Sequence, residues 1–80
     1  MMNDLEFGTI RLHVKERMEE QNLSINKLSF RAEMQRTQLK KYCKNDVQRL
    51  DIADLSRLCY ALDCDLSDIV EYIPPHKTDK

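Results

Sequence analysis

The feature that most constrains the fold of this 80-residue chain is its near-complete lack of residues that break helices. The only glycine is Gly8 and the only prolines are Pro74 and Pro75, so no such residue occurs between Thr9 and Ile73. This excludes a glycine-rich phosphate-binding loop and a series of β-hairpins with glycine turns. Because aromatic residues make up only 6% of the chain, a small β-barrel is also disfavoured. The sequence therefore predicts a single all-α domain.

The spacing of the apolar residues predicts five short helices. The first covers residues 10–21, although the β-branched residues within 9–14 also fit an extended start. Residues 9–73 are expected to form the domain, with flexible termini at 1–8 and 74–80. The second helix begins after Ser24 as N-cap, the third covers 36–44, the fourth begins after Asp51, and the fifth begins after Asp65 and continues to Ile73.

The connections between these helices contain few turn residues. Asn22 is expected to stop the first helix, and Asn45 tolerates the left-handed conformation that ends helices. Residues 33–35 lack an apolar register and predict a tight connection between the second and third helices. The side chains expected to face the core are Ile10, Val14, Met18, Ile25, Leu28, Ala32, Leu39, Tyr42, Cys43, Leu55, Leu58, Cys59, Leu62, Leu66, Ile69, Val70 and Ile73.

Charge is distributed unevenly along the chain. The net charge is only −1 and the pI about 6.1, which taken globally argues against a nucleic-acid-binding protein. Residues 24–49, however, contain seven basic and two acidic residues, for a net charge of +5, and the rest of the chain carries −6. Arg36, Lys40 and Lys44 recur every four residues and so share one face of the third helix. A solvated helix face is the simpler interpretation, but so many basic residues favour nucleic-acid binding.

The cysteines and histidines give no sign of a disulfide framework, a metal site or a catalytic centre. Cys43, Cys59 and Cys64 form an odd set without CxxC spacing, and no export signal or long apolar run is present. We therefore expect reduced thiols in a cytoplasmic protein. His13 and His76 lack neighbours with metal-ligand spacing, so we expect no metal, no cofactor and no enzymatic activity.

Several segments resemble one known family. Leu28, Ala32 and Met34, the run 37–42, the leucine-rich run 55–65 and the residues 68–70 are similar to the lambda-repressor/Cro-like helix-turn-helix family, also called the XRE family. The resemblance covers residues 10–73. The chain departs from the family at Glu33 and Asn45, where members usually have glycine, and at Gln35, where they usually have serine or threonine. Because a non-glycine residue rarely adopts a positive φ, Glu33 predicts a strained or altered turn.

The resemblance implies that the third helix lies in the major groove of double-stranded DNA. Arg36, Thr37, Gln38, Lys40 and Lys41 would then contact base edges, with Gln38 reading adenine if it turns toward the groove. Residues on either side would contact phosphates and so position the protein: Ser24, Asn26, Gln35, Lys44, Gln48 and Arg49.

The resulting prediction is a sequence-specific DNA-binding transcriptional regulator, acting as a repressor. A homodimer is expected, formed through Ile69, Val70, Tyr72 and Ile73 of the fifth helix, with no membrane partner and no small-molecule ligand. The alternative is an antitoxin-like or adaptor module that binds a protein through its fourth and fifth helices, with DNA binding secondary. An exposed patch at Tyr72, Ile73 and Pro74 is the feature we expect to bear on this choice.

Overall fold

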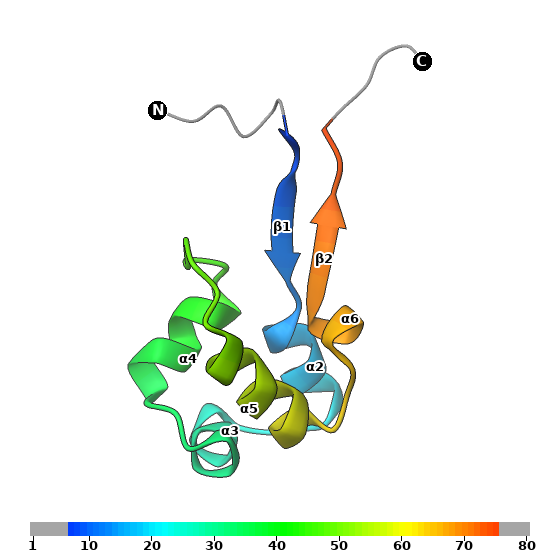
Figure 1. Cartoon of the computed structure of the whole chain (residues 1–80). Coiled ribbons are helices and arrows are strands. Elements are labelled where there is room, and N and C mark those ends of the chain that lie inside the picture. Colours follow the sequence, from blue (N-terminus) through cyan, green and yellow to red (C-terminus); the bar gives the residue numbers. More distant parts are fainter. Residues whose placement is uncertain (1–6, 76–80) are drawn as a thin grey trace.

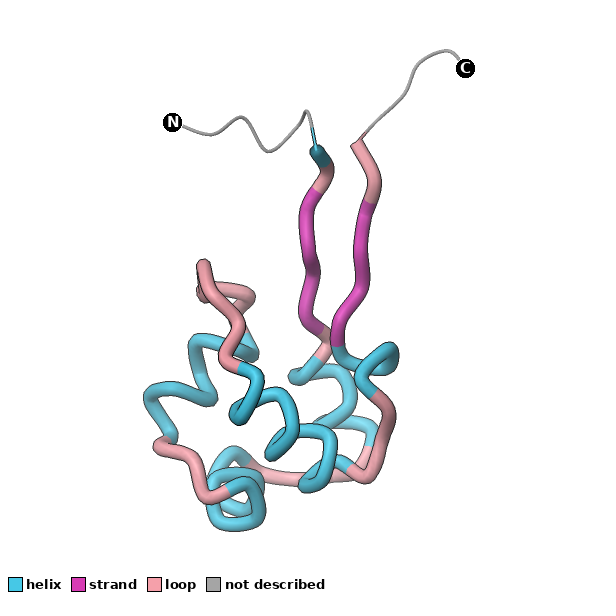
Figure 2. Tube along the Cα trace, viewed as in Figure 1, coloured by secondary structure: helices cyan, strands magenta, loops and turns pink. Residues whose placement is uncertain are grey.

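Figure 1 shows the computed structural model, which describes residues 7–75. Five helices form a compact body, and two antiparallel strands lie side by side and extend away from it (Figures 1 and 2). The predicted flexible termini fall mainly on residues 1–6 and 76–80, which lie outside the described part. The elements in chain order are β1 (Thr9–Leu12), α2 (Val14–Glu20), α3 (Ile25–Ala32), α4 (Arg36–Cys43), α5 (Ile52–Leu62), α6 (Leu66–Ile69) and β2 (Val70–Ile73).

The two-stranded sheet shows that the prediction of an all-α fold is wrong in part. β1 and β2 pair with Thr9 opposite Ile73 and Leu12 opposite Val70. The backbone N–H of His13 continues this ladder by donating to the carbonyl of Ile69 at 2.8 Å. The first helix therefore begins at residue 14 rather than 10, and the extended alternative for its start is confirmed for 9–12.

The last predicted helix is also too long, because it ends at Ile69 and residues 70–73 are a strand. The spacing of Ile69, Val70 and Ile73 fits a helix, but 70–73 is also rich in residues that favour strands. A strand needs a partner, and β1 lies about 60 residues earlier in the sequence. Pairing with this distant segment decides the conformation.

The single glycine lies where the chain passes the end of β2. Gly8 has φ +83°, and a Cβ atom there would lie 2.3 Å from the carbonyl oxygen of Ile73. The Tyr72 hydroxyl donates to the carbonyl of Phe7 at 2.8 Å on the same side of the sheet end. A larger residue at position 8 would therefore push the strands apart.

The core lies where the helices meet beneath the sheet. Three residues predicted to face it do not: Ile10 and Leu66 are each 50% exposed, and Ile73 is half-buried on the sheet face opposite to Leu12 and Val70. All three cysteines are free and half-buried, and burial raises the pKa of each thiol, which keeps the thiols protonated. The buried apolar residues are Leu12, Val14, Leu28, Ala32, Met34, Leu39, Tyr42, Leu58, Ala61, Leu62 and Ile69.

The predicted helix caps are confirmed. The Ser24 hydroxyl accepts the N–H of Lys27 at 3.1 Å, and the Asp51 carboxylate accepts the N–H groups of Ala53 and Asp54. At the start of α6 the Asp68 carboxylate accepts the N–H of Asp65 at 3.0 Å. These bonds satisfy backbone donors that the first turn of a helix leaves without partners.

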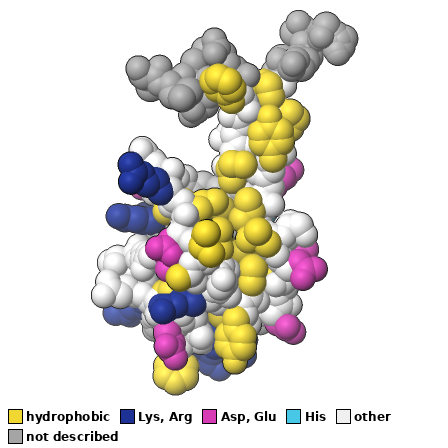
Figure 3. Space-filling model, in the orientation of Figure 1, with side chains coloured by type: hydrophobic (Ala, Val, Ile, Leu, Met, Phe, Trp, Pro, Cys, Tyr) yellow, Lys and Arg dark blue, Asp and Glu magenta, His cyan; other side chains and the backbone are white. Residues whose placement is uncertain are grey.

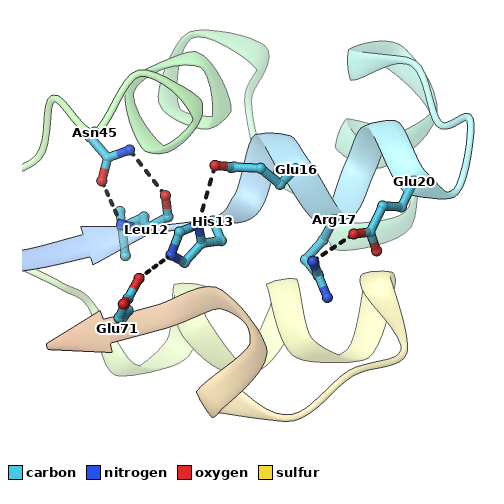
Figure 4. Close-up of polar contacts among 7 residues, drawn as sticks. All are labelled: Leu12, His13, Glu16, Arg17, Glu20, Asn45 and Glu71. Atoms are coloured by element: carbon cyan, nitrogen blue, oxygen red, sulfur yellow. Dashed lines mark hydrogen bonds and ion pairs between the residues drawn. The ribbon is translucent and has the colours of Figure 1, made fainter.

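Asn45 joins the end of α4 to β1 (Figure 4). Its side-chain Oδ1 accepts the N–H of Leu12 at 2.5 Å, and its Nδ2 donates to the carbonyl of Leu12 at 3.0 Å. The residue has φ 60°, as predicted for a left-handed helix end. The sheet and α4 are thus held in a fixed relation by one amide side chain.

Candidate nucleic-acid interface

The candidate interface is built on α3 and α4, which are joined by the three residues 33–35. Glu33 closes α3 in the left-handed conformation, with φ 54° and ψ 46°. The turn is therefore tight, as predicted. Glu33 adopts the left-handed conformation although it is not a glycine. A strained conformation of this kind costs a non-glycine residue about 1 kcal/mol.

Three contacts hold this turn in place. Met34 is 5% exposed and packs into the core. The Ser29 hydroxyl donates to the carbonyl of Met34 at 2.5 Å, and the Arg57 guanidinium of α5 donates to the carbonyl of Glu33 at 2.9 Å. The orientation of α4 relative to α3 is thus set by packing on one side and by an arginine on the other.

The two sides of α4 differ sharply in exposure. Leu39 and Tyr42 face the core and are at most 2% exposed. The predicted base-reading residues other than Gln38 are on the outside: Arg36, Thr37, Lys40 and Lys41 are all exposed. The guanidinium of Arg36 donates one hydrogen bond to Asn26 Oδ1 of α3, at 2.9 Å. It keeps other N–H groups for an external partner, since guanidinium has five.

Gln38 lies differently from its neighbours on α4. Its side chain is half-buried, and its Nε2 donates to the Oδ2 atom of Asp54 on α5. The same oxygen accepts the Tyr42 hydroxyl at 3.1 Å. Burial, and then the hydrogen bond to Asp54, raise the pKa of Tyr42 and keep it a donor. Tyr42 is thus confirmed as a core residue.

The predicted phosphate-binding residues lie around the ends of α3 and α4. Ser24 and Asn26 are at the start of α3, where the Ser24 hydroxyl already serves as the cap. Gln35 occupies the N-cap position of α4 without a side-chain capping bond, so its amide remains free to contact a ligand. Lys44, Gln48 and Arg49 follow α4 and are exposed.

The basic side chains of this region have no acidic partners within residues 7–75, where the ion pairs involve only His13 with Glu16 and Glu71, and Arg17 with Glu20. In Figure 3, Lys and Arg side chains are seen over α4 and the loop after it, and acidic side chains are seen both beside them and at the opposite edge near α6. Arg31 lies against α5 instead, where its guanidinium donates to the carbonyl of Ala61. The predicted clustering of basic residues is therefore found on the folded surface, but acidic residues are not confined to the opposite edge.

An open hollow of about 710 Å³ lies between α4 and the loop that follows it. Thr37, Gln38 and Lys41 line it from α4, Arg49 lines it from the loop, and Asp54 lines it from α5. The hollow thus brings together three candidate base-reading residues with two candidate phosphate-binding residues, Gln35 and Arg49. The remaining candidates do not line it: Arg36, Lys40, Ser24, Asn26, Lys44 and Gln48.

The proposed dimer surface on the fifth helix does not exist in the predicted form. Ile69 is completely buried, and Val70, Tyr72 and Ile73 belong to β2 rather than to a helix. Tyr72 is nevertheless 57% exposed, Pro74 is exposed and Ile73 is half-buried. Hydrophobic side chains form a band from the helical body along the sheet (Figure 3).

Sequence reasoning missed the structural roles of three residues. The sequence alone predicts no side-chain contact for Asp54 or Arg57, and only a helix end at Asn45. Their partners come from other elements, so no local pattern signals these contacts.

No group of three His, Cys, Asp or Glu side chains suited to a metal ion occurs within residues 7–75. None of the helices in that range has the length and apolar character needed to cross a membrane.

Two helices joined by a three-residue turn, the second presenting a basic face, define the helix-turn-helix class of DNA-binding domains. A family model of the Cro/C1-type HTH DNA-binding domain matches residues 13–75, so the chain belongs to that family. Double-stranded DNA is the partner that this family implies, and its domains are in general not enzymes. A search of curated protein sequences found no match.

Proposed function

We propose that this protein is a sequence-specific transcriptional regulator that binds double-stranded DNA with α4 in the major groove. The observation that carries the proposal is the row of exposed, unpaired basic residues on the outer face of α4 and in the loop after it. The inner face of the same helix is anchored by Leu39 and Tyr42. A rigid helix with a free basic face meets the requirements of groove binding.

The individual roles follow from position on the helix. Arg36, Thr37, Lys40 and Lys41 are placed to contact bases, since the N-terminal residues of such a helix approach base edges. Arg36 suits guanine, whose O6 and N7 atoms accept a bidentate pair. Contacts to phosphates are assigned to residues around the helix ends: Ser24, Asn26, Gln35, Lys44, Gln48 and Arg49.

We infer that the regulatory effect is repression in the cytoplasm. A protein that occupies the major groove excludes other proteins from the same base pairs, which is the simplest route to repression. The three free, protonated thiols fit a reducing compartment.

Binding selection from a random duplex library tests the assignment to DNA. The wild-type protein should select a defined site, and its affinity should fall with salt by a log–log slope of about −0.9 for each phosphate contacted. Arg36→Ala should relax the preference at one base position, at a cost of about 1–3 kcal/mol, whereas Arg49→Ala should weaken all sequences alike. Lys15→Gln, on α2, is the matched control and should change neither property. Absence of duplex binding at about 50 mM salt would refute the function.

We also propose that the regulator is a homodimer, formed through the apolar face of the sheet. Ile10 and Tyr72 are directly opposite each other on this face and are 50% and 57% exposed. The other pair on the face, Leu12 and Val70, packs against the core. Together with the partly exposed Leu50, which borders the same groove as Ile10, these residues form what we call the sheet patch: Ile10, Tyr72 and Leu50.

A second copy of the chain fits the sheet patch because the patch is apolar and carries no charge. Arg11 and Glu71 pair with each other in register and therefore point to the opposite face, where they cannot repel across a two-fold axis. A two-stranded sheet is also only marginally stable by itself, and packing of a second copy against its exposed apolar face would stabilise it. This surface replaces the one predicted on the fifth helix.

Sedimentation at micromolar concentration tests the dimer. Tyr72→Asp should produce a monomer, whereas Tyr60→Asp, which changes an 82% exposed tyrosine on α5, should remain dimeric. The dimer should select a palindrome with half-sites about 10 bp apart. A wild-type monomer that selects a single asymmetric site would overturn the dimer. The same exposed patch favours the second candidate, an antitoxin-like or adaptor module, and that candidate would require a different protein to occupy it.

A further inference from the structure

The hydrogen bond between Gln38 and Asp54 fixes the orientation of an amide on the proposed DNA-facing helix. Asp54 is 9% exposed, and its Oδ2 atom accepts from both Gln38 Nε2 and the Tyr42 hydroxyl. A carboxylate can only accept hydrogen bonds, so the NH2 end of the amide must face it. The carbonyl oxygen Oε1 of Gln38 then points away from Asp54.

The Oε1 atom of Gln38 is free to contact a ligand. No donor within residues 7–75 contacts it, and it is not among the buried polar atoms of that range that lack a partner. Gln38 also borders the hollow whose other walls carry Thr37, Lys41 and Arg49. An accessible acceptor therefore lies among the residues proposed to meet DNA.

We propose that Asp54 is a positioning residue that determines specificity, because it makes Gln38 present an acceptor to the major groove. The inference rests on the proposed placement of α4 in that groove. An unrestrained glutamine reads adenine with both ends of its amide, donating to N7 and accepting from N6. Asp54 accepts from only one of the two N–H bonds of this NH2 group, but it fixes the orientation of the amide, so Gln38 turns its acceptor Oε1 toward the groove.

An acceptor at this position distinguishes bases by their donors. In the major groove adenine offers its N6 amino group and cytosine its N4 amino group, whereas the corresponding atoms of guanine and thymine are acceptors. The position facing Gln38 should therefore admit adenine and cytosine, in preference to guanine and thymine. A net hydrogen bond of ordinary strength gives a preference of about three- to tenfold.

Selection from a random duplex library tests the inference in four proteins. Gln38→Met keeps the side-chain length but lacks the amide. It should abolish the base preference at one position of the selected site, and this identifies the base pair that faces Gln38. Wild-type protein should prefer adenine or cytosine there over guanine and thymine by about three- to tenfold. Asp54→Asn keeps the shape of the side chain, but its amide can donate as well as accept, so both orientations of Gln38 become available. The preference should fall below about twofold at this position alone. Tyr42→Phe removes the other hydrogen bond to the same oxygen and should leave the preference intact.

The outcomes separate this inference from the proposed function. If wild-type protein selects no site, the proposed function fails. If it selects a site in which the Gln38 position prefers guanine or thymine, only the role of Asp54 is overturned. The same holds if Gln38→Met alters no position, or if a folded Asp54→Asn protein keeps the wild-type preference. The wild-type base preference is thus a test even if Asp54→Asn does not fold.

Discussion

Replacing Asn45 tests how firmly α4 is attached to the sheet. The side chain makes two hydrogen bonds with the backbone of Leu12, at 2.5 and 3.0 Å, and its own backbone has φ 60°. Asn45→Gly removes both bonds but keeps a residue that adopts positive φ without strain. Asn45→Ala removes the same bonds and adds a residue for which that conformation is unfavourable.

The two substitutions should therefore differ by the cost of the backbone conformation. A net hydrogen bond contributes about 0.5–1.5 kcal/mol, and both bonds are only partly buried, so we expect Asn45→Gly to lower the free energy of unfolding by about 1–2 kcal/mol. Asn45→Ala should lower it by about 1 kcal/mol more. Proposed DNA contacts of the loop after α4 should weaken in both variants.

Urea denaturation of the three proteins measures these values. A small domain has an m value of about 1 kcal/mol per molar urea, so the midpoint of Asn45→Gly should fall by about 1–2 M. A glycine variant as stable as the wild type would show that the bonds to Leu12 contribute nothing. Equal stabilities of the glycine and alanine variants would show that the left-handed backbone does not matter.

Substitutions at three further positions test separate features of the fold. Glu33→Gly removes the left-handed strain in the turn before α4 and should raise the free energy of unfolding by about 0.5–1 kcal/mol, measured as a higher melting temperature. Asp51→Ala removes the cap of α5 and should cost about 1 kcal/mol in urea denaturation, whereas Asp51→Asn should cost less. Hydrogen bonds that His13 donates to the carboxylates of Glu71 and then Glu16 raise the pKa of His13 above its usual 6.5. The charged form is therefore favoured in the folded state, so this stabilisation is complete below about pH 6.5 and is lost as the pH rises above it. The group is partly exposed, so the loss should be below about 1 kcal/mol and absent in His13→Gln, as measured by urea denaturation at pH 6 and pH 8.

The helix boundaries that could be predicted are those set by local chemistry. Ser24 and Asp51 each satisfy N–H groups two or three residues later in the chain, so residue type and position are sufficient to identify the caps. The left-handed helix end at Asn45 is local in the same way. The sheet could not be predicted because each strand depends on a partner at the other end of the domain. Ile10 and Tyr72 fit apolar helical positions in the sequence and become exposed strand residues only when the strands pair.

In the candidate site, too, features set by local spacing could be predicted and features set by distant residues could not. The exposed basic face of α4 follows from helical spacing. Leu39 and Tyr42 are three residues apart and share the buried face, so the side chains on the opposite face of the helix must point outward. The inward orientation of Gln38 depends on Asp54, a residue of a different helix, so no spacing within α4 predicts it. Sequence therefore identifies which face meets a ligand, but not how each polar group on that face is oriented.

The near-neutral total charge is compatible with the proposed contact with DNA because basic side chains gather over α4 and the loop after it, while part of the acidic charge lies at the far edge near α6. At physiological salt, electrostatic interactions between exposed charges are screened over about 8 Å. The acidic residues at the α6 edge thus weaken the attraction of the α4 face less than their number suggests, because that face is on the opposite side of the molecule. They also disfavour approach of the phosphate backbone from their own side. The acidic side chains at the α6 edge therefore contribute to orientation, because they leave α4 and the loop after it as the favourable route to a duplex.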